Sequence, residues 1–353
     1  MRHEGARIDL AGLTLEQLIE LLEEWGVPAF RARQIYGWLF RSLASDSGEM
    51  RNLPAALRER LALSCRVRAA SACAETVSRD GLTRKVLLEL ADGELVESVL
   101  MLYPERATVC VSSQVGCAIG CPFCATGQSG LERNLSAAEI VEQVLHYARS
   151  LKAEGRTVTN VVFMGMGEPL ANYEAVWQAM RILNAPEGFG LGARHMTIST
   201  AGMVPEIRRL ATAELQVGLA VSLHAADDAL RDQLVPLNRG FPIAEVVEAC
   251  DEYCERTGRR VSYEYALIAG VNDSPAQARE LGRLLRGRLC HVNLIPLNAT
   301  GGSLWRGSSG EVVRAFQRQL ANTGVKATVR VERGREVEAA CGQLRRRHLR
   351  GEG

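Results

Sequence analysis

The chain has 353 residues, enough for one large domain or a domain with an attachment, and 42 basic against 41 acidic residues leave a formal net charge of +1. Hydrophobic residues make up 47% and charged residues 24%, ordinary values for a globular protein that argue against a disordered chain, a collagen or a membrane bundle. The opening residues MRHEGARIDLAG contain no apolar run, and no stretch of about eighteen apolar residues follows, so the sequence predicts neither a secretory signal nor a membrane span.

Residues 1–64 are predicted to form a helical accessory domain. Thr14 and Gln17 form a capping-box pattern, in which each side chain bonds the backbone N–H of the other residue, and apolar residues follow at helical spacing. A second helical stretch, residues 30–40, alternates basic and aromatic side chains, a composition that can stack on and grip RNA. The alternative is a small domain whose aromatic residues form its own core. Three arginines would then remain on the outside: Arg31, Arg33 and Arg41.

Residues 65–103 are predicted to be a β-rich linker. Apolar residues alternate between Thr83 and Tyr103, and the turn pair Asp92-Gly93 stands in the middle, which indicates a β-hairpin.

An α/β barrel is predicted for residues 104–340. Six short β-rich runs alternate there with helical patterns: TVCVSS, NVVFMG, HMTIST, QVGLAVSL, RVSYEYALI and CHVNLIP. This alternation predicts parallel strands joined by crossover helices, with the functional site at the C-terminal strand ends. Six units favour a partial (β/α)6 barrel over a closed eight-fold one. Residues 341–353 remain as a C-terminal segment with an arginine-rich tail.

Ten cysteines are the outlying count in the composition, and three of them share one loop after the first barrel strand. The segment QVGCAIGCPFCATG places Cys117, Cys121 and Cys124 as C-x-x-x-C-x-x-C among glycines. In the reducing cytosol, the compartment expected for this chain, grouped thiols indicate metal or redox chemistry more often than disulfides. Thiolates ligate iron–sulfur clusters, whereas structural zinc would need a fourth ligand, and none stands at a suitable spacing. Three ligands leave one iron of a four-iron cluster open, as a catalytic metal requires; the alternative is three unrelated buried cysteines.

This cysteine pattern, placed after the first strand of a predicted β/α barrel, resembles that of the radical S-adenosylmethionine superfamily. The flanking segments ATVCVSSQVGC, GLERNLSAAEI, VVFMGMGEPLAN, LAVSLHA and AACGQL narrow the resemblance to the RlmN/Cfr family of RNA methyltransferases. The N-terminal segments FRARQIYGWLF and MRNLPAALRERL are more similar to the RlmN branch. The resemblance implies one [4Fe-4S] cluster ligated by Cys117, Cys121 and Cys124, with S-adenosylmethionine bound at the open iron.

The implied activity is methylation of carbon 2 of an adenosine in 23S rRNA and of an adenosine beside the tRNA anticodon. The resemblance also implies an external, flavodoxin-like electron donor, a monomeric state, a cytoplasmic location and no membrane partner. Two alternatives stay open. One is Cfr-type methylation of carbon 8 of the same rRNA base. The other is a non-catalytic iron–sulfur or zinc-containing RNA-binding module, in which Cys341 would have no role.

The segment GMGEP follows the predicted strand NVVFMG. Its glycines let the backbone approach a ligand, and its glutamate offers an acceptor for an ammonium group; an ordinary strand-to-loop turn is the alternative. The resemblance assigns seven residues to S-adenosylmethionine binding, all at or just past predicted strand ends: Gly167, Glu168, Ser199, Ser222, Leu223, His224 and Asn298. Without the resemblance, His224 would be interpreted as a satisfied core histidine.

Carbon 2 of adenine is electron-poor and carries no acidic hydrogen, so simple nucleophilic methyl transfer is not available there. The resemblance implies that one S-adenosylmethionine methylates the Cys341 thiolate. A second supplies a 5′-deoxyadenosyl radical that activates this methyl group for addition to the base. Cys110 would then release the protein–RNA adduct by forming a disulfide with Cys341, and Glu97 would remove the proton from the modified carbon. Taken alone, Glu97 would be a solvated strand residue.

The remaining five cysteines carry no motif. Cys250 and Cys254 stand four residues apart on a predicted helix and are expected to pack on one face. Cys65, Cys73 and Cys290 are expected to be small core residues.

Overall fold

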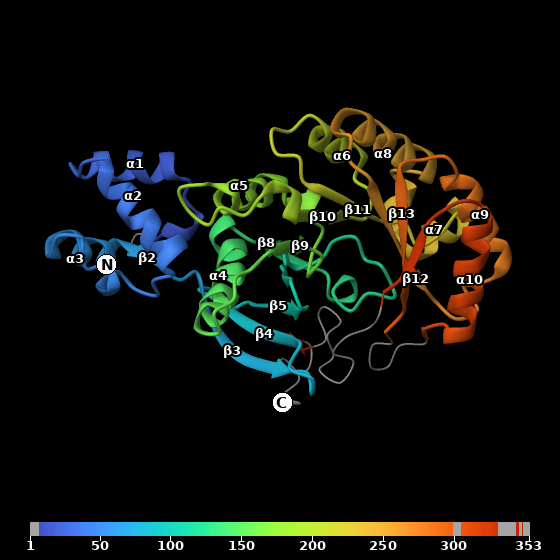
Figure 1. Ribbon diagram of the computed structural model, residues 1–353, viewed down its shortest axis with the longest axis horizontal. Coiled ribbons are helices and arrows are strands. Elements are labelled where there is room, and N and C mark those ends of the chain that lie inside the picture. The colour runs from blue at the N-terminus through green and yellow to red at the C-terminus, as the bar shows by residue number, and fades with distance from the viewer. Residues whose placement is uncertain (1–6, 299–304, 331–343, 346–347, 349–353) are drawn as a thin grey trace.

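One open sheet of ten strands organises the computed structural model, which describes residues 7–298, 305–330, 344, 345 and 348. The strand order is β14-β13-β12-β11-β10-β9-β6-β5-β4-β3 (Figure 1). Since this order has two ends, the sheet in the described part of the chain does not close on itself. The predicted α/β class and partial barrel are confirmed.

The barrel part of the sheet is parallel throughout. Its strands are β6 (Ala107–Cys110), β9 (Asn160–Phe163), β10 (Met196–Thr200), β11 (Gly218–Ser222), β12 (Val261–Leu267), β13 (Cys290–Pro296) and β14 (Ala327–Val329). The first six coincide with the six predicted runs. The edge strand β14 is an addition that the sequence analysis missed, because three residues of ATV carry too little pattern to distinguish a strand from a loop.

An antiparallel extension joins the other side of β6. The predicted hairpin is confirmed as β4 (Thr83–Leu90) and β5 (Leu95–Leu102), and a further strand, β3 (Ala70–Val77), forms the edge. A bulge interrupts β3 between Ala72 and Ala74 and leaves Cys73 exposed. The prediction that Cys73 is a core residue is therefore wrong, because on an edge strand the face away from the helices stays open to solvent.

Three short helices form the N-terminal part, which Figure 1 shows beside the sheet: α1 (Leu15–Glu24), α2 (Phe30–Gly37) and α3 (Ala55–Ser64). The predicted capping box of α1 is present. After α2 the chain continues as one π-helical turn, Trp38–Ser42. Tyr36 and Phe40 are buried, with their ring centroids 4.5 Å apart. These two aromatic residues therefore belong to the hydrophobic core, in agreement with the alternative to RNA stacking. The short strands β1 (Ile8–Asp9) and β2 (Cys65–Arg66) pair beneath them.

Helices cover the outer face of the barrel strands (Figure 1). They are α4 (Ala137–Ala153), α5 (Tyr173–Asn184), α6 (Val204–Ala211), α8 (Ile243–Thr257), α9 (Pro275–Leu285) and α10 (Gly310–Asn322). Cys250 is buried on α8 and Cys254 packs at the edge of the same core, as predicted; Cys65 and Cys290 also contact the core. None of the described helices is both long and apolar enough to cross a membrane.

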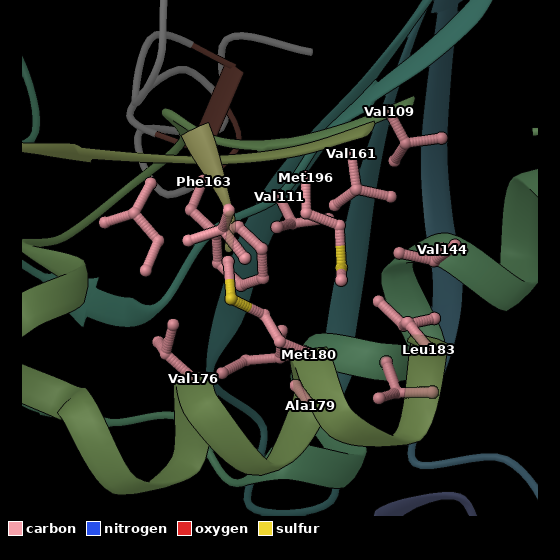
Figure 2. Close-up of a cluster of buried hydrophobic side chains, with 14 of the residues drawn as sticks. Val109, Val111, Val144, Val161, Phe163, Val176, Ala179, Met180, Leu183 and Met196 are labelled. Carbon is pink, nitrogen blue, oxygen red and sulfur yellow. The ribbon is translucent and has the colours of Figure 1, made fainter. Parts of the chain in front are cut away.

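The core lies between the sheet and these helices. Figure 2 shows Val176, Met180 and Leu183 of α5 beneath strand residues that include Phe163 and Met196. On each parallel strand, alternate residues enter this core, and the residues between them face the inner side of the sheet. The inner side is therefore where functional side chains can gather.

Substituting the fully buried Phe163 by alanine is expected to lower the free energy of unfolding by about 3–5 kcal/mol, because the change removes a large apolar side chain and leaves a cavity. Urea denaturation followed by circular dichroism measures this. Val77→Ala, at a half-exposed edge position, is the control and should cost less than about 1 kcal/mol. An equal loss in both variants would contradict the assignment of Phe163 to the core.

Candidate active site

A loop between two short strands carries the three motif cysteines. Strands β7 (Gln114–Gly116) and β8 (Leu131–Asn134) pair antiparallel and bring the two ends of the loop together. Gly116 adopts φ +80°, and a side chain there would collide with the carbonyl of Gly130, so only glycine fits this position. The Cys117 N–H donates to the same carbonyl at 2.7 Å. The glycines of the motif thus allow the loop to curl with its thiols close together.

The thiols of Cys117, Cys121 and Cys124 are half-buried, and they lie close enough to interact electrostatically. The pKa of Cys117 is raised to about 11, mainly by burial and to a smaller extent by the nearby Glu168 and Cys124. Burial also raises the pKa of Cys121, with Cys124 and Cys117 adding to the effect. In the absence of a bound metal, burial therefore favours the protonated thiols of Cys117 and Cys121 at neutral pH.

The donor set suits a cluster better than a single ion. Within the described ranges, no group of three or more His, Cys, Asp or Glu side chains converges on a point that could hold one metal ion. A single zinc ion would draw every sulfur to within about 2.3 Å of one centre. A multi-iron cluster is ligated by thiolates at different irons, so three cysteines on one loop supply the type of donor that it requires.

Glu168 lies fully buried just after β9, where its two carboxylate oxygens join neighbouring strand ends. Oε1 accepts the Leu170 N–H at 3.0 Å, and Oε2 accepts the Ala201 N–H beyond β10 at 2.7 Å. Burial raises the pKa of Glu168 to about 7, although these hydrogen bonds oppose the shift. A buried carboxyl with this pKa is suited to a cationic partner, which would hold it ionised.

Gly167 precedes Glu168 with φ +99°, and a side chain there would collide with Gln114. The Gln114 side-chain oxygen accepts the Glu168 N–H at 2.8 Å, while its amide nitrogen donates to Asn134 at 2.8 Å. The turn after β9 is thereby fastened to the hairpin of the cysteine loop. This contact explains why the GMGEP turn requires glycine at position 167.

His224 follows β11 in the left-handed conformation, with φ +61°. Its Nδ1 accepts the Ala266 N–H at 3.0 Å, and burial lowers its pKa to about 3. The ring is therefore neutral with its proton on Nε2, which leaves Nε2–H as a donor. The Asn272 side chain donates to the carbonyls of His224 and Ala266 and holds this backbone in place.

The other predicted ligand residues lie at the same edge of the sheet. Ser199 and Ser222 occupy inner-face positions at the ends of β10 and β11. Leu223 is buried directly after β11, and Asn298 lies two residues beyond β13. Residues 299–304, which follow Asn298 in the chain, lie outside the described residues.

Glu97 is buried, so its interpretation as a solvated strand residue is wrong. Its Oε2 accepts a hydrogen bond from Lys85 Nζ at 2.7 Å, and both side chains are at most 2% exposed. They project from β5 and β4 on the inner face. Val99 pairs with Cys110 of β6, which places Glu97 diagonally from Cys110 on that face, roughly 7–8 Å away for such a pair.

The C-terminal segment reaches this position. The Arg345 N–H donates to Glu97 Oε1 at 2.7 Å, and the Arg345 guanidinium pairs with Glu94 at 3.0 Å. Cys341, the predicted methyl carrier, lies outside the described residues, four positions before Arg345. Cys110 thus lies on the same sheet face as Glu97, which Arg345 contacts.

Four residues that support the site carry no local sequence signal: Gln114, Lys85, Asn272 and Arg231. Each acts on a residue at least seven positions away in the chain, so no motif would have revealed it. A fifth, Glu264, is buried on β12 opposite Ser222, and its Oε2 has no hydrogen-bond partner within the described residues. Such buried polar groups become recognisable only when strand register is known.

Comparisons with known proteins agree with this architecture. The profile of the Radical SAM superfamily matches residues 111–281, and that of the Ribosomal RNA large subunit methyltransferase N-terminal domain matches residues 8–67. A curated relative from Salinispora arenicola, named a probable dual-specificity RNA methyltransferase RlmN, is 54% identical over 95% of this chain and 90% of its own length. The Chloroflexus aurantiacus protein of the same name is 52% identical over 95% of this chain and 92% of its own.

A solved structure shows the same similarity in three dimensions. The crystal structure of a radical SAM methyltransferase from Sphaerobacter thermophilus is 53% identical to this chain and superposes with a TM-score of 0.94. The match covers 95% of this chain and 98% of that one.

Proposed function

Because the chain belongs to the RlmN family of radical S-adenosylmethionine RNA methyltransferases, we propose that it transfers a methyl group to carbon 2 of an adenosine in 23S rRNA. We extend the proposal to an adenosine next to the tRNA anticodon, in keeping with the dual specificity in the relatives' names. One observation supports this proposal most directly: the three-thiol loop, the buried Glu168 and the inner-face Cys110 lie at the same edge of the sheet. The non-catalytic alternative has no comparable support.

In this proposal Cys117, Cys121 and Cys124 hold a [4Fe-4S] cluster, and Glu168, with the turn at Gly167, receives the ammonium group of S-adenosylmethionine. When bound, the cluster supplies the electron that cleaves the sulfonium of S-adenosylmethionine. Four further residues are assigned to the rest of that molecule: Ser199, Ser222, Leu223 and His224. Asn298 joins them from the end of β13. The Nε2–H of neutral His224 supplies a donor that keeps its proton across physiological pH.

The chain's own thiols carry the methyl group in this scheme. Cys341 bears it to the base, and Glu97 accepts the proton from the modified carbon. Cys110 then attacks the Cys341 sulfur, so that an S–S bond forms while the bond from this sulfur to the base-bound carbon breaks. The released carbon takes up a proton and becomes the methyl group of the RNA product. The shared face of Glu97 and Cys110 supports these roles, as does the Arg345 contact that brings the C-terminal segment to Glu97. The Lys85 ammonium group contacts Glu97 Oε2 at 2.7 Å and holds this carboxylate on the inner face of the sheet.

The RNA would also contact the N-terminal helices. Phe30 is 49% exposed, with the Arg31 guanidinium 4.7 Å from its ring centroid, and Arg33 and Arg41 are exposed as the sequence analysis expected. An exposed aromatic beside cations can stack on unpaired bases and meet phosphates. We place the enzyme in the cytoplasm, where its proposed rRNA substrate lies, as a monomer served by an external flavodoxin-like electron donor.

Mass spectrometry of digested 23S rRNA, modified by anaerobically reconstituted protein with S-adenosylmethionine and a reductant, tests the proposal. We expect 2-methyladenosine together with 5′-deoxyadenosine. Methylation at carbon 8 would instead establish the Cfr-type reaction, and absence of 5′-deoxyadenosine would refute the radical enzyme. The same assay with a tRNA substrate tests the second specificity.

A Cys110→Ala substitution is expected to stop the reaction after the methyl group has joined the base, because no second thiolate can release the adduct. Protein with covalently attached RNA should accumulate, visible as a retarded band on a denaturing gel. Cys65→Ala, at another buried cysteine, serves as the control and should release its product. Free methylated RNA from Cys110→Ala at the normal rate would exclude this role.

Binding of S-adenosylmethionine is expected to release a proton below pH 7. The folded pKa of Glu168, about 7, exceeds its ordinary value, so the ligand-free carboxyl favours folding most at low pH and loses this contribution as the pH rises through 7. A bound ammonium group instead favours the ionised carboxylate of Glu168. The affinity for S-adenosylmethionine should therefore increase from pH 5 to 7 and then level off. Calorimetry in two buffers of different ionisation enthalpy measures the released proton.

The matched control for this prediction is Glu174→Gln, which makes the same chemical change at an exposed carboxylate of α5. It should retain the pH dependence, whereas Glu168→Gln should remove it. If wild-type affinity does not change between pH 5 and 7, Glu168 is not the ammonium partner.

A further inference from the structure

Arg231 is the largest side chain in the described part of the protein that is wholly buried. It lies on the short helix α7 (Asp228–Leu234), directly after the loop that contains His224. An arginine with no exposed surface is unusual, because removing a guanidinium from water is costly unless its charge and its N–H groups find partners.

All five N–H groups of Arg231 have acceptors. Nε donates to the Leu223 carbonyl at 3.1 Å, and Nη2 donates to the carbonyls of Ala201 at 2.5 Å and Ser222 at 3.3 Å. Nη1 donates to Asn238 Oδ1 at 2.8 Å and to the Phe241 carbonyl at 3.5 Å. A guanidinium has five such donors, so none remains to contact a ligand.

These bonds fasten the ends of two barrel strands. Ala201 follows β10 and is held from both sides, since its N–H donates to Glu168 and its carbonyl accepts from Arg231. Ser222 is the last residue of β11, and Leu223 follows it directly. Arg231 therefore positions the backbone beside the residues assigned to S-adenosylmethionine without reaching the ligand itself.

The hydrogen bonds satisfy the donors of Arg231 but leave its charge without a direct counter-ion. Within the described residues none of its acceptors is a carboxylate. Two carboxylates act on it without a direct contact: Asp228 at longer range, and Asp232 through a relay in which Asn238 accepts from Arg231 and donates to Asp232 Oδ1 at 2.7 Å. Burial accordingly lowers the pKa of Arg231 to about 10.

Cys121 packs against a small apolar cluster that Arg231 contacts through one of its members. This cluster contains Ala201, whose carbonyl Arg231 binds, and Leu234, which lies three residues further along α7. Negative charge at Cys121 raises the pKa of Arg231, and the charge of Arg231 lowers that of Cys121. Because apolar side chains exclude water between them, the attraction is weakly screened.

We propose that Arg231 is a positioning residue whose fixed positive charge compensates the thiolate-bound cluster at Cys117, Cys121 and Cys124 and raises its reduction potential. Three thiolates leave such a cluster with a net negative charge, and accepting an electron makes it more negative. A buried cation beside Cys121 therefore stabilises the reduced state more than the oxidised state. The inference rests on the proposed function, because it presumes that the three thiols hold a cluster.

The test is an anaerobic redox titration of the reconstituted protein, followed by electron paramagnetic resonance, in wild type, Arg231→Met and Arg231→Lys. Loss of the charge in Arg231→Met should shift the midpoint potential to more negative values. At a fixed potential, the ratio of reduced to oxidised cluster should fall by at least about tenfold. For a one-electron couple this corresponds to a midpoint shift of about 59 mV. Arg231→Lys keeps the charge and loses the planar fork, so its potential should stay near the wild-type value while its thermal stability falls.

A second variant avoids removing Arg231. The double substitution Asp232→Asn/Asn238→Asp moves one carboxylate from the far end of the relay into direct contact with Nη1 and leaves the total charge of the chain unchanged. This double variant should also lower the midpoint potential of the cluster. If Arg231→Met fails to fold, the double variant still tests whether the charge of Arg231 sets that potential. The control is Arg149→Met, which removes a largely buried arginine paired with Glu142 on α4 and should leave the potential unchanged.

The outcomes are distinct. A cluster of unaltered potential in Arg231→Met or in the double variant overturns the proposal, as does an equal shift in Arg231→Lys or in Arg149→Met. If wild-type protein binds no iron and sulfide, the proposed function itself fails. Iron and sulfide content, measured before each titration, separates these results.

Discussion

Replacing Cys341 by alanine will abolish methylation of RNA, with a loss of at least about 10³-fold, as expected when the nucleophile of a covalent mechanism is removed. Carbon 2 of adenine does not react as a nucleophile toward a methyl sulfonium, so the reaction needs a carrier that presents the methyl group in another form. The proposed carrier is the Cys341 thiolate, and no neighbouring residue of AACGQL can replace it.

The measurement is transfer of labelled methyl from S-adenosylmethionine to an rRNA fragment by anaerobically reconstituted protein. Cys73→Ala is the control, because Cys73 is an exposed cysteine on the edge strand and should retain full activity. The iron content of Cys341→Ala should equal that of wild type, which separates loss of the carrier from loss of the cluster. If Cys341→Ala still methylates the RNA, the carrier mechanism is wrong.

Cys121→Ala is expected to eliminate both stable iron–sulfur binding and activity. Two thiols cannot hold a four-iron cluster that already leaves one iron open, so the expected loss of activity is complete. The ligand-free protein should nevertheless fold. Burial keeps the Cys121 thiol neutral, and a neutral buried thiol behaves as a small apolar group that alanine replaces at a cost of about 1–2 kcal/mol.

Iron and sulfide analysis after anaerobic reconstitution checks this result. Cys250→Ala removes a more deeply buried thiol, in the core on α8, and it should bind iron as wild type does. Wild-type iron content in Cys121→Ala would show that this residue is not a ligand. Equal iron loss in Cys250→Ala would point to a general folding defect.

Much of the fold follows from patterns that are local in the sequence. The capping boxes at Thr14 and Ser136 set helix starts within four residues, and alternating β-rich runs mark each of the first six barrel strands. The cysteine spacing is equally local, so the thiol loop could be predicted outright. The family resemblance assigned Glu168 and Ser222 to the same site as the cysteines, and parallel strands are consistent with this because they place their C-terminal ends at one edge.

The tertiary structure decided what each side chain faces, because burial depends on which strands pair. Glu97 looked like a solvated strand residue until β4 supplied Lys85 and the C-terminal segment supplied Arg345. Cys73 looked like core until the bulge in β3 left it exposed.

Arg231 is the strongest case of this dependence. Its sequence neighbourhood is that of an ordinary amphipathic helix, yet its bonds to the ends of β10 and β11 make it a buried charge beside Cys121. The sequence by itself determined the secondary structure elements, the thiol loop and the family, since these depend on residues a few positions apart. Only the assembled sheet decided which charges are buried together, since those partners come from distant strands.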